Sequence, residues 1–153
     1  MKNLFIPSAV FVILLMSTAS AQAHVVLDQK SAPAGSAYAA TFKVGHGCSG
    51  LATTEIIVYL PEGIDTANAV SQQGWQLDQS VARQVRWHRG LLQNKERAQF
   101  VMNVQLPKQI GTIYWRVKQI CQNGVIDWSE VPSKSEPDRK LKTPAAVLEL
   151  TEK

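Results

Sequence analysis

The sequence predicts an all-β domain in which about seven or eight short strands pack as a β-sandwich. Apolar residues alternate with polar ones over segments of about 5 to 9 residues, which is the period of a strand with one buried face. Turn-forming Gly, Pro and Asn residues separate these segments. The chain has 153 residues, of which 45% are apolar and 18% charged, so it has the length of one domain and can bury a core.

The expected strands follow the alternating residues along the chain. They cover residues 38–44, 54–60, 81–87, 100–106, 113–121, 125–131 and 145–150. The Asn-Gly pair at 123–124 predicts a hairpin between the fifth and sixth of these segments. Residues 91–98 are ambiguous, because their Gln, Lys, Glu, Arg and Ala side chains also suit a helical turn. The polar residues 133–143 should form a mobile loop before the last strand.

The first 23 residues predict a signal peptide. Lys2 supplies a positive charge, an apolar stretch follows around 9–16, and Ala21 and Ala23 form the A-x-A pattern that signal peptidase cleaves. The apolar run is shorter than the about 20 residues of a transmembrane helix, and a retained N-terminal anchor is the alternative. We expect a signal peptide at 1–23, one domain at 24–153, and a periplasmic or secreted product without a transmembrane segment.

The charge pattern argues against nucleic-acid binding. Sixteen basic and twelve acidic side chains give a net charge of +4, without a long run of Lys or Arg. Arg83, Arg86 and Arg89 come closest to such a run, and their spacing fits the solvent face of a strand. The sequence also contains no recognisable Ser/His/Asp set, paired-carboxylate pocket or Gly-rich phosphate loop, so we do not expect an enzyme.

Cys48 and Cys121 are the only cysteines, and export to an oxidising compartment favours a disulfide between them. Closing so long a loop should stabilise the fold by about 4 kcal/mol. The alternative is a thiolate metal site of the kind that binds copper(I). The absence of a C-x-x-C spacing and of a Met-rich stretch argues against that alternative.

Cleavage after Ala23 would make His24 the first residue of the mature chain. An N-terminal histidine offers two nitrogens, the α-amine and the imidazole Nδ1, which can close a chelate ring on one metal ion. The amine titrates near about pH 8 and the imidazole near about 6.5, so a metal can bind both at neutral pH. Such nitrogen ligands suit copper(II). The alternative is that His24 merely follows a cleavage site.

Several short motifs together resemble the YcnI-like copper-binding domain family of exported bacterial proteins, from His24 to about Pro132. The matching segments are His24-Val25-Val26-Leu27, Ala34-Gly35, Val44-Gly45-His46-Gly47-Cys48, Thr53-Thr54, Val58, Pro61-Glu62-Gly63, Gly74-Trp75, Trp87, Cys121 and Trp128-Ser129-Glu130-Val131-Pro132. The resemblance implies an immunoglobulin-like β-sandwich. It also implies copper(II) held by one N-terminal histidine, here His24, with a tryptophan beside the metal, here Trp128. The basic segment 133–143 departs from the family pattern.

Two further ligands are expected around His24. His46, in the His-Gly-Cys pattern, is either a metal ligand or a loop histidine that caps its own turn. Glu130 is expected on the side of Trp128, opposite Asp127, either as a ligand or as a surface carboxylate. His88 should be solvated, and the tryptophans at 75, 87 and 115 should belong to the core.

These observations predict an exported protein that stores, buffers or delivers copper(II). The resemblance implies that its partner is another periplasmic or membrane protein that handles copper. Two alternatives stay open: a copper-dependent oxidative enzyme, and an immunoglobulin-like interaction or assembly module without a metal.

Overall fold

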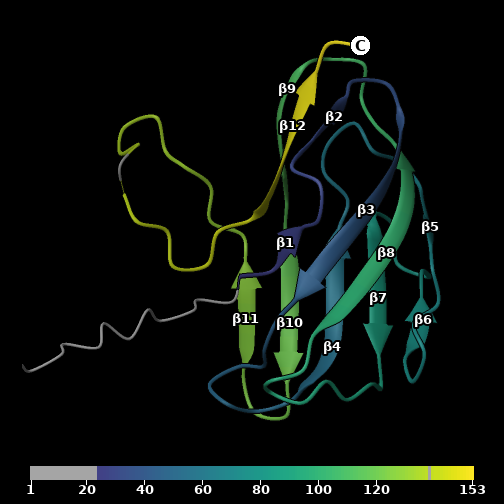
Figure 1. Cartoon of the computed structure of the whole chain (residues 1–153), viewed down its shortest axis with the longest axis vertical. Coiled ribbons are helices and arrows are strands. Elements are labelled where there is room, and N and C mark those ends of the chain that lie inside the picture. The colour runs from purple at the N-terminus through teal and green to yellow at the C-terminus, as the bar shows by residue number, and fades with distance from the viewer. Residues whose placement is uncertain (1–23, 138) are drawn as a thin grey trace, which may run out of the picture.

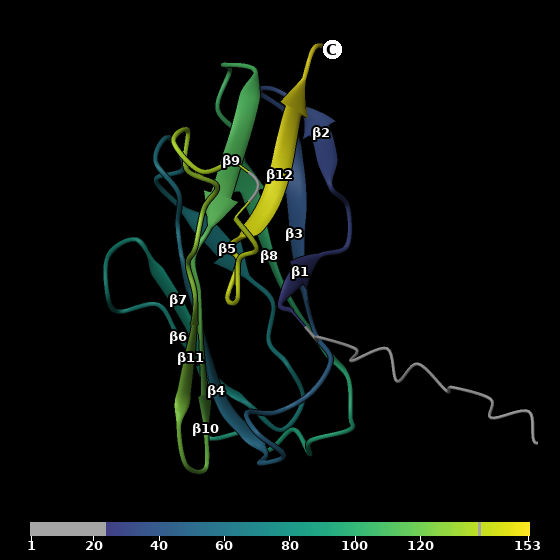
Figure 2. The same cartoon turned by 90° about the vertical axis from the view of Figure 1, so that its left-hand side faces the viewer.

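Alternating apolar residues build two facing sheets in the computed structural model (Figure 1). The structure describes residues 24–137 and 139–153, so the predicted signal peptide lies outside the described residues. Seen from the side, β10 and β11 belong to one layer and β1 and β3 to the other (Figure 2). Within the described residues, no helix is long and apolar enough to cross a membrane.

The first layer has four antiparallel strands in the order β1-β3-β8-β5. They are β1 (Val26–Leu27), β3 (Ala37–Val44), β8 (Ala98–Gln105) and β5 (Ala67–Ala69). In the central pair Phe42 lies opposite Phe100, and both side chains are fully buried. Their polar sequence neighbours face the other way, as the period of two predicts.

The second layer has five antiparallel strands in the order β11-β10-β4-β7-β6. They are β11 (Val125–Trp128), β10 (Val117–Cys121), β4 (Thr53–Tyr59), β7 (Gln84–His88) and β6 (Gln76–Asp78). The predicted hairpin joins β10 and β11, with Ile120 opposite Val125. Gly124 has a φ of 119° in the turn, a backbone conformation that glycine adopts without steric cost.

A third sheet, in the order β2-β12-β9, lies at one end of the sandwich (Figure 1). Its strands are β2 (Ser31–Pro33), β12 (Ala146–Thr151) and β9 (Gly111–Trp115). β2 pairs with β12 in parallel, and β9 pairs with it antiparallel. The chain changes from this sheet to the second layer at Arg116, because β9 ends at Trp115 and β10 begins at Val117.

Aromatic side chains fill the space between the layers. Trp87 and Trp115 are fully buried, and their rings contact those of Phe100 and Phe42 at centroid distances of 5.4 and 5.5 Å. Trp75 is partly buried against the same core. The prediction that these three tryptophans belong to the core is confirmed.

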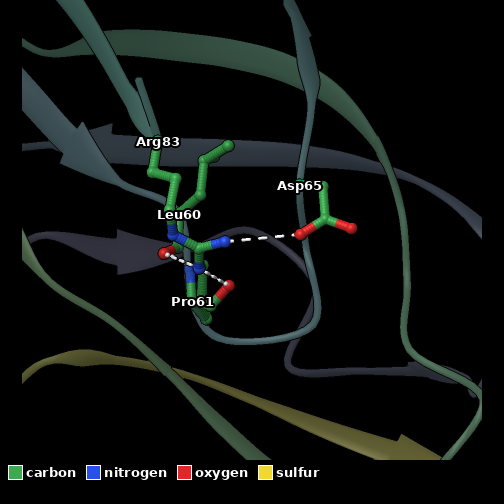
Figure 3. Close-up of polar contacts among 4 residues, drawn as sticks. All are labelled: Leu60, Pro61, Asp65 and Arg83. Atoms are coloured by element: carbon green, nitrogen blue, oxygen red, sulfur yellow. Dashed lines mark hydrogen bonds and ion pairs between the residues drawn. The ribbon is translucent and has the colours of Figure 1, made fainter. Parts of the chain in front are cut away.

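The strand predicted at 81–87 starts too early. Val81 is 53% exposed, and Arg83 has a φ of 59° immediately before β7. The Arg83 guanidinium instead donates hydrogen bonds to the carbonyls of Leu60 and Pro61 and pairs with Asp65 (Figure 3). This side chain therefore ties a turn to the end of β4.

Two other expectations from this region also need correction. Arg89 has a φ of 57° and follows the end of β7, so Arg86 is the one arginine of the three that lies on the strand. Residues 91–97 form a loop and not a helix. It contains one turn, in which the N–H of Glu96 donates to the carbonyl of Gln93, and Leu92 exchanges two main-chain hydrogen bonds with Thr53. This bridge holds the loop against β4.

Candidate metal centre

His24 lies at the entry to β1, beside the end of β3. It is half-buried, and the residues on either side of Val26 are buried in the core. Val26 pairs with Lys43 in the antiparallel register of β1 and β3. His24 precedes this pair by two residues, and Gly45 follows the end of β3. His46, the second predicted ligand, follows immediately in the chain.

The imidazole of His24 contacts the indole of Trp128 edge-on. The ring centroids are 5.6 Å apart and the ring planes are inclined by 66°. Trp128 is the last residue of β11 and is 4% exposed, so the indole covers one side of the imidazole. The structure thus brings together the two residues on which the copper hypothesis depends most.

Gln119 connects Trp128 to the loop that carries His46. The indole N–H of Trp128 donates to Oε1 of Gln119 at 3.0 Å. Nε2 of Gln119 donates to the main-chain carbonyl of His46 and to the hydroxyl of Thr53, both at 2.7 Å. Sequence reasoning missed Gln119. The signal was its position between Val117 and Cys121, which places a polar side chain on the buried face of β10.

The predicted disulfide is present between Cys48 and Cys121, with their Cα atoms 5.9 Å apart. It joins the loop after β3 to the end of β10, and both residues are buried. Neither cysteine is free, so the alternative of a thiolate site is wrong. Gly47 is required beside the disulfide, because a Cβ there would lie 1.6 Å from the carbonyl oxygen of Leu51.

The His46 ring lies within hydrogen-bond distance of its own loop, with Nδ1 2.7 Å from the carbonyl oxygen of Gly47. A carbonyl only accepts, so Nδ1 is the donor in this contact. A histidine in that tautomer can bind a metal through Nε2. His46 also lines a surface cavity of about 440 Å³ together with Lys95 and Arg97.

Glu130 holds the loop that precedes β12. Its Oε2 accepts hydrogen bonds of 2.6 Å from the main-chain N–H groups of Lys142 and Thr143, and its Oε1 contacts Arg139 at 3.2 Å. The N–H of Thr143, helped by that of Lys142 and the charge of Arg139, lowers the pKa of the Glu130 carboxyl. These contacts give Glu130 a structural role. Its role as a metal ligand stays a prediction.

Asp127 is held by a different partner. Arg116 forms two hydrogen bonds with its carboxylate, and they lower the pKa of Asp127. Asp127 is therefore tied to the residue that precedes β10. His88 is half-buried at the end of β7, opposite Gln76 of β6.

Copper(II) stays a prediction for this end of β3. Among the residues that the structure describes, no three His, Cys, Asp or Glu side chains form a metal-binding group. A chelate through the amine and the imidazole of His24 needs fewer side chains, since one residue supplies two nitrogens. His46, two residues after the end of β3, is the candidate for a third nitrogen, and a nitrogen-rich set is the kind that copper(II) prefers.

Sequence comparison identifies one protein family for this chain. The model described as "Domain of unknown function (DUF1775)" matches residues 24–83 and 76–150. A comparison with curated proteins found no match.

Comparison with solved structures supports the fold. An uncharacterized protein from Nocardia farcinica, reported to have an immunoglobulin-like fold, matches with a TM-score of 0.69 and 25% identity, over 83% of this chain and 97% of that one. The Reelin-N domain of F-spondin matches with a TM-score of 0.52 and 9% identity, over 86% and 87% of the two chains. The chain is thus an immunoglobulin-like β-sandwich, as predicted.

Proposed function

This chain belongs to the DUF1775 family, and we propose that its mature form binds copper(II) through His24. The observation that carries the proposal is the edge-on contact between the His24 imidazole and the buried Trp128 indole. A half-buried histidine ring held against a tryptophan has few orientations. Restricting the ligand before the metal arrives reduces the entropy lost on binding.

Each residue has a distinct part in the proposed site. His24 supplies Nδ1 and, once residues 1–23 are removed, the α-amine. His46 supplies Nε2, because its Nδ1 contacts the carbonyl of Gly47. Trp128 does not bind the metal but excludes water from one side of it. The ion would contribute its preference for a tetragonal arrangement of nitrogen and oxygen ligands.

We propose that the protein stores, buffers or delivers copper(II) outside the cytoplasm and is not an enzyme. The disulfide fits an oxidising compartment. Because His24 is half-buried and not enclosed, another protein can reach the ion and remove it. The proposed partner is a periplasmic or membrane protein that accepts copper.

A copper titration of protein that begins at His24 tests this proposal. We expect one copper(II) ion per chain, a nitrogen-rich paramagnetic spectrum, and quenching of Trp128 fluorescence. The matched control carries one alanine before His24, which converts the α-amine into an amide and changes no side chain. A second control, His88→Ala, should bind normally.

The outcomes of this titration are distinct. Loss of binding in the extended protein supports the chelate. An unchanged spectrum in the extended protein refutes a role for the amine, and a His24-initiated protein that binds no copper refutes the proposed function.

A further inference from the structure

We propose that Gln119 is a positioning residue of the metal site, which fixes Trp128 and the main chain of His46 in one arrangement. This inference rests on the proposed function and adds to it a residue that does not touch the metal. It follows from the hydrogen bonds of one buried amide group.

Burial makes Gln119 unusual. In the part of the chain that the structure describes, Gln119 and Thr53 are the buried polar side chains, at 1% and 0% exposed. Leaving a buried amide without partners costs about 1–3 kcal/mol. An apolar side chain would avoid that risk, as Val117 does on the same face of β10. The amide therefore needs a reason other than packing.

Each hydrogen bond of the Gln119 side chain has a definite donor and acceptor. The indole N–H of Trp128 can only donate, so it determines that the carbonyl side of the amide faces it. The two hydrogens of the amide nitrogen then point to the carbonyl of His46 and to the hydroxyl of Thr53. Every donor of the NH₂ group is used. A fully satisfied buried network of this kind specifies one arrangement of its members.

This arrangement reaches both histidines of the proposed site. The bond to Trp128 fixes the direction of the indole N–H, and hence the orientation of the ring whose centroid lies 5.6 Å from that of His24. The bond to the His46 carbonyl fixes the loop at that residue. Two residues later the disulfide fixes the same loop at Cys48. The His46 ring is thus attached to a segment held at two points.

The disulfide and the amide form one connected group. The N–H of Cys48 lies 3.0 Å from the sulfur of Cys121, and that sulfur lies 3.7 Å from the hydroxyl of Thr53. The same hydroxyl accepts from Gln119. A continuous chain of contacts therefore runs from the disulfide to the ring beside His24.

Two substitutions at this position test the inference. Gln119→Met keeps the length of the side chain and removes all three hydrogen bonds. Gln119→Glu keeps an acceptor for Trp128 but loses both donors. Gln99→Leu, at an exposed position of β8, is the matched control for removing a glutamine from a strand.

Two measurements separate positioning from stability. In metal-free protein, hydrogen exchange of the Trp128 indole N–H should accelerate in Gln119→Met and stay slow in Gln119→Glu and Gln99→Leu. In the copper titration, Gln119→Met should bind about 10–100-fold more weakly with an altered spectrum. Gln119→Glu should recover part of the affinity, and Gln99→Leu should match the wild type.

The results that overturn the inference are clear. If Gln119→Met and Gln119→Glu bind copper(II) with wild-type affinity and spectrum, Gln119 positions nothing. If they differ from the wild type only in unfolding temperature, the role of Gln119 is structural. If the wild type itself binds no copper, the proposed function fails and this inference fails with it.

Discussion

Removing the bond between Cys48 and Cys121 should destabilise the domain without changing its fold. The bond joins two segments that also meet through main-chain contacts, since Gln122 donates its N–H to the carbonyl of Ala52. These contacts persist after reduction. The main effect should therefore fall on the unfolded chain, which gains freedom when the loop opens.

The loop length sets the magnitude. The two cysteines are 73 positions apart. The chain-entropy model gives about 4 kcal/mol for a loop of this size, against a total of about 5–15 kcal/mol for an ordinary domain. For a domain of this length each kcal/mol corresponds to about 3–5 °C in Tm, so the Tm should fall by roughly 15 °C.

Urea unfolding followed by tryptophan fluorescence measures this effect. The oxidised protein is compared with the same protein in a thiol reductant and with the double variant Cys48→Ala/Cys121→Ala. The reduced protein isolates the cross-link, whereas the double variant also removes two buried sulfur atoms. The variant should therefore be less stable than the reduced protein.

The comparison can refute the reasoning directly. A reduced protein with an unchanged free energy of unfolding would show that the cross-link does not restrict the unfolded chain. A double variant more stable than the reduced protein would show that the buried sulfurs do not contribute packing.

Three further predictions concern individual residues. Because the pKa of Glu130 is lowered in the folded protein, the stabilisation by its carboxylate is complete above the ordinary pKa and is lost as the pH falls through the lowered value. Proteolysis of the loop before β12 should increase at that pH, and Glu130→Gln should be susceptible to the protease already at neutral pH. Gly47→Ala should destabilise the protein by about 1–3 kcal/mol in urea unfolding, because Leu51 occupies the space of the new Cβ; a wild-type midpoint would contradict this. Arg83→Gly should remove the backbone strain of the positive φ but lose three side-chain hydrogen bonds, including that to Asp65. In thermal unfolding this variant should therefore have a lower Tm than Arg83→Lys.

Much of the fold could be predicted from the chain because long strands carry their own pattern. β3 and β8 each alternate buried and exposed residues over eight positions. The hairpin and the disulfide were equally accessible, because an Asn-Gly pair and a single pair of cysteines leave few alternatives. By contrast β1, β5 and β6 have two or three residues each, too few to show a period. Their existence depends on partners elsewhere in the chain.

The site was predicted only in part, for a related reason. His24 and Trp128 could be selected from sequence, but their contact requires β1 of the first layer to face β11 of the second. Gln119 was overlooked because a glutamine on a strand usually faces solvent. The signal that it faces inward was its place between Val117 and Cys121, which lie on the buried face of β10.

The parallel pairing of β2 with β12 has a consequence for how the molecule forms. Ser31 to Pro33 pair with Glu149 to Thr151, more than one hundred positions later in the chain. β12 is the neighbour of β2 in its sheet, so β2 gains this pairing only when β12 has been made. Contacts between such distant residues slow folding.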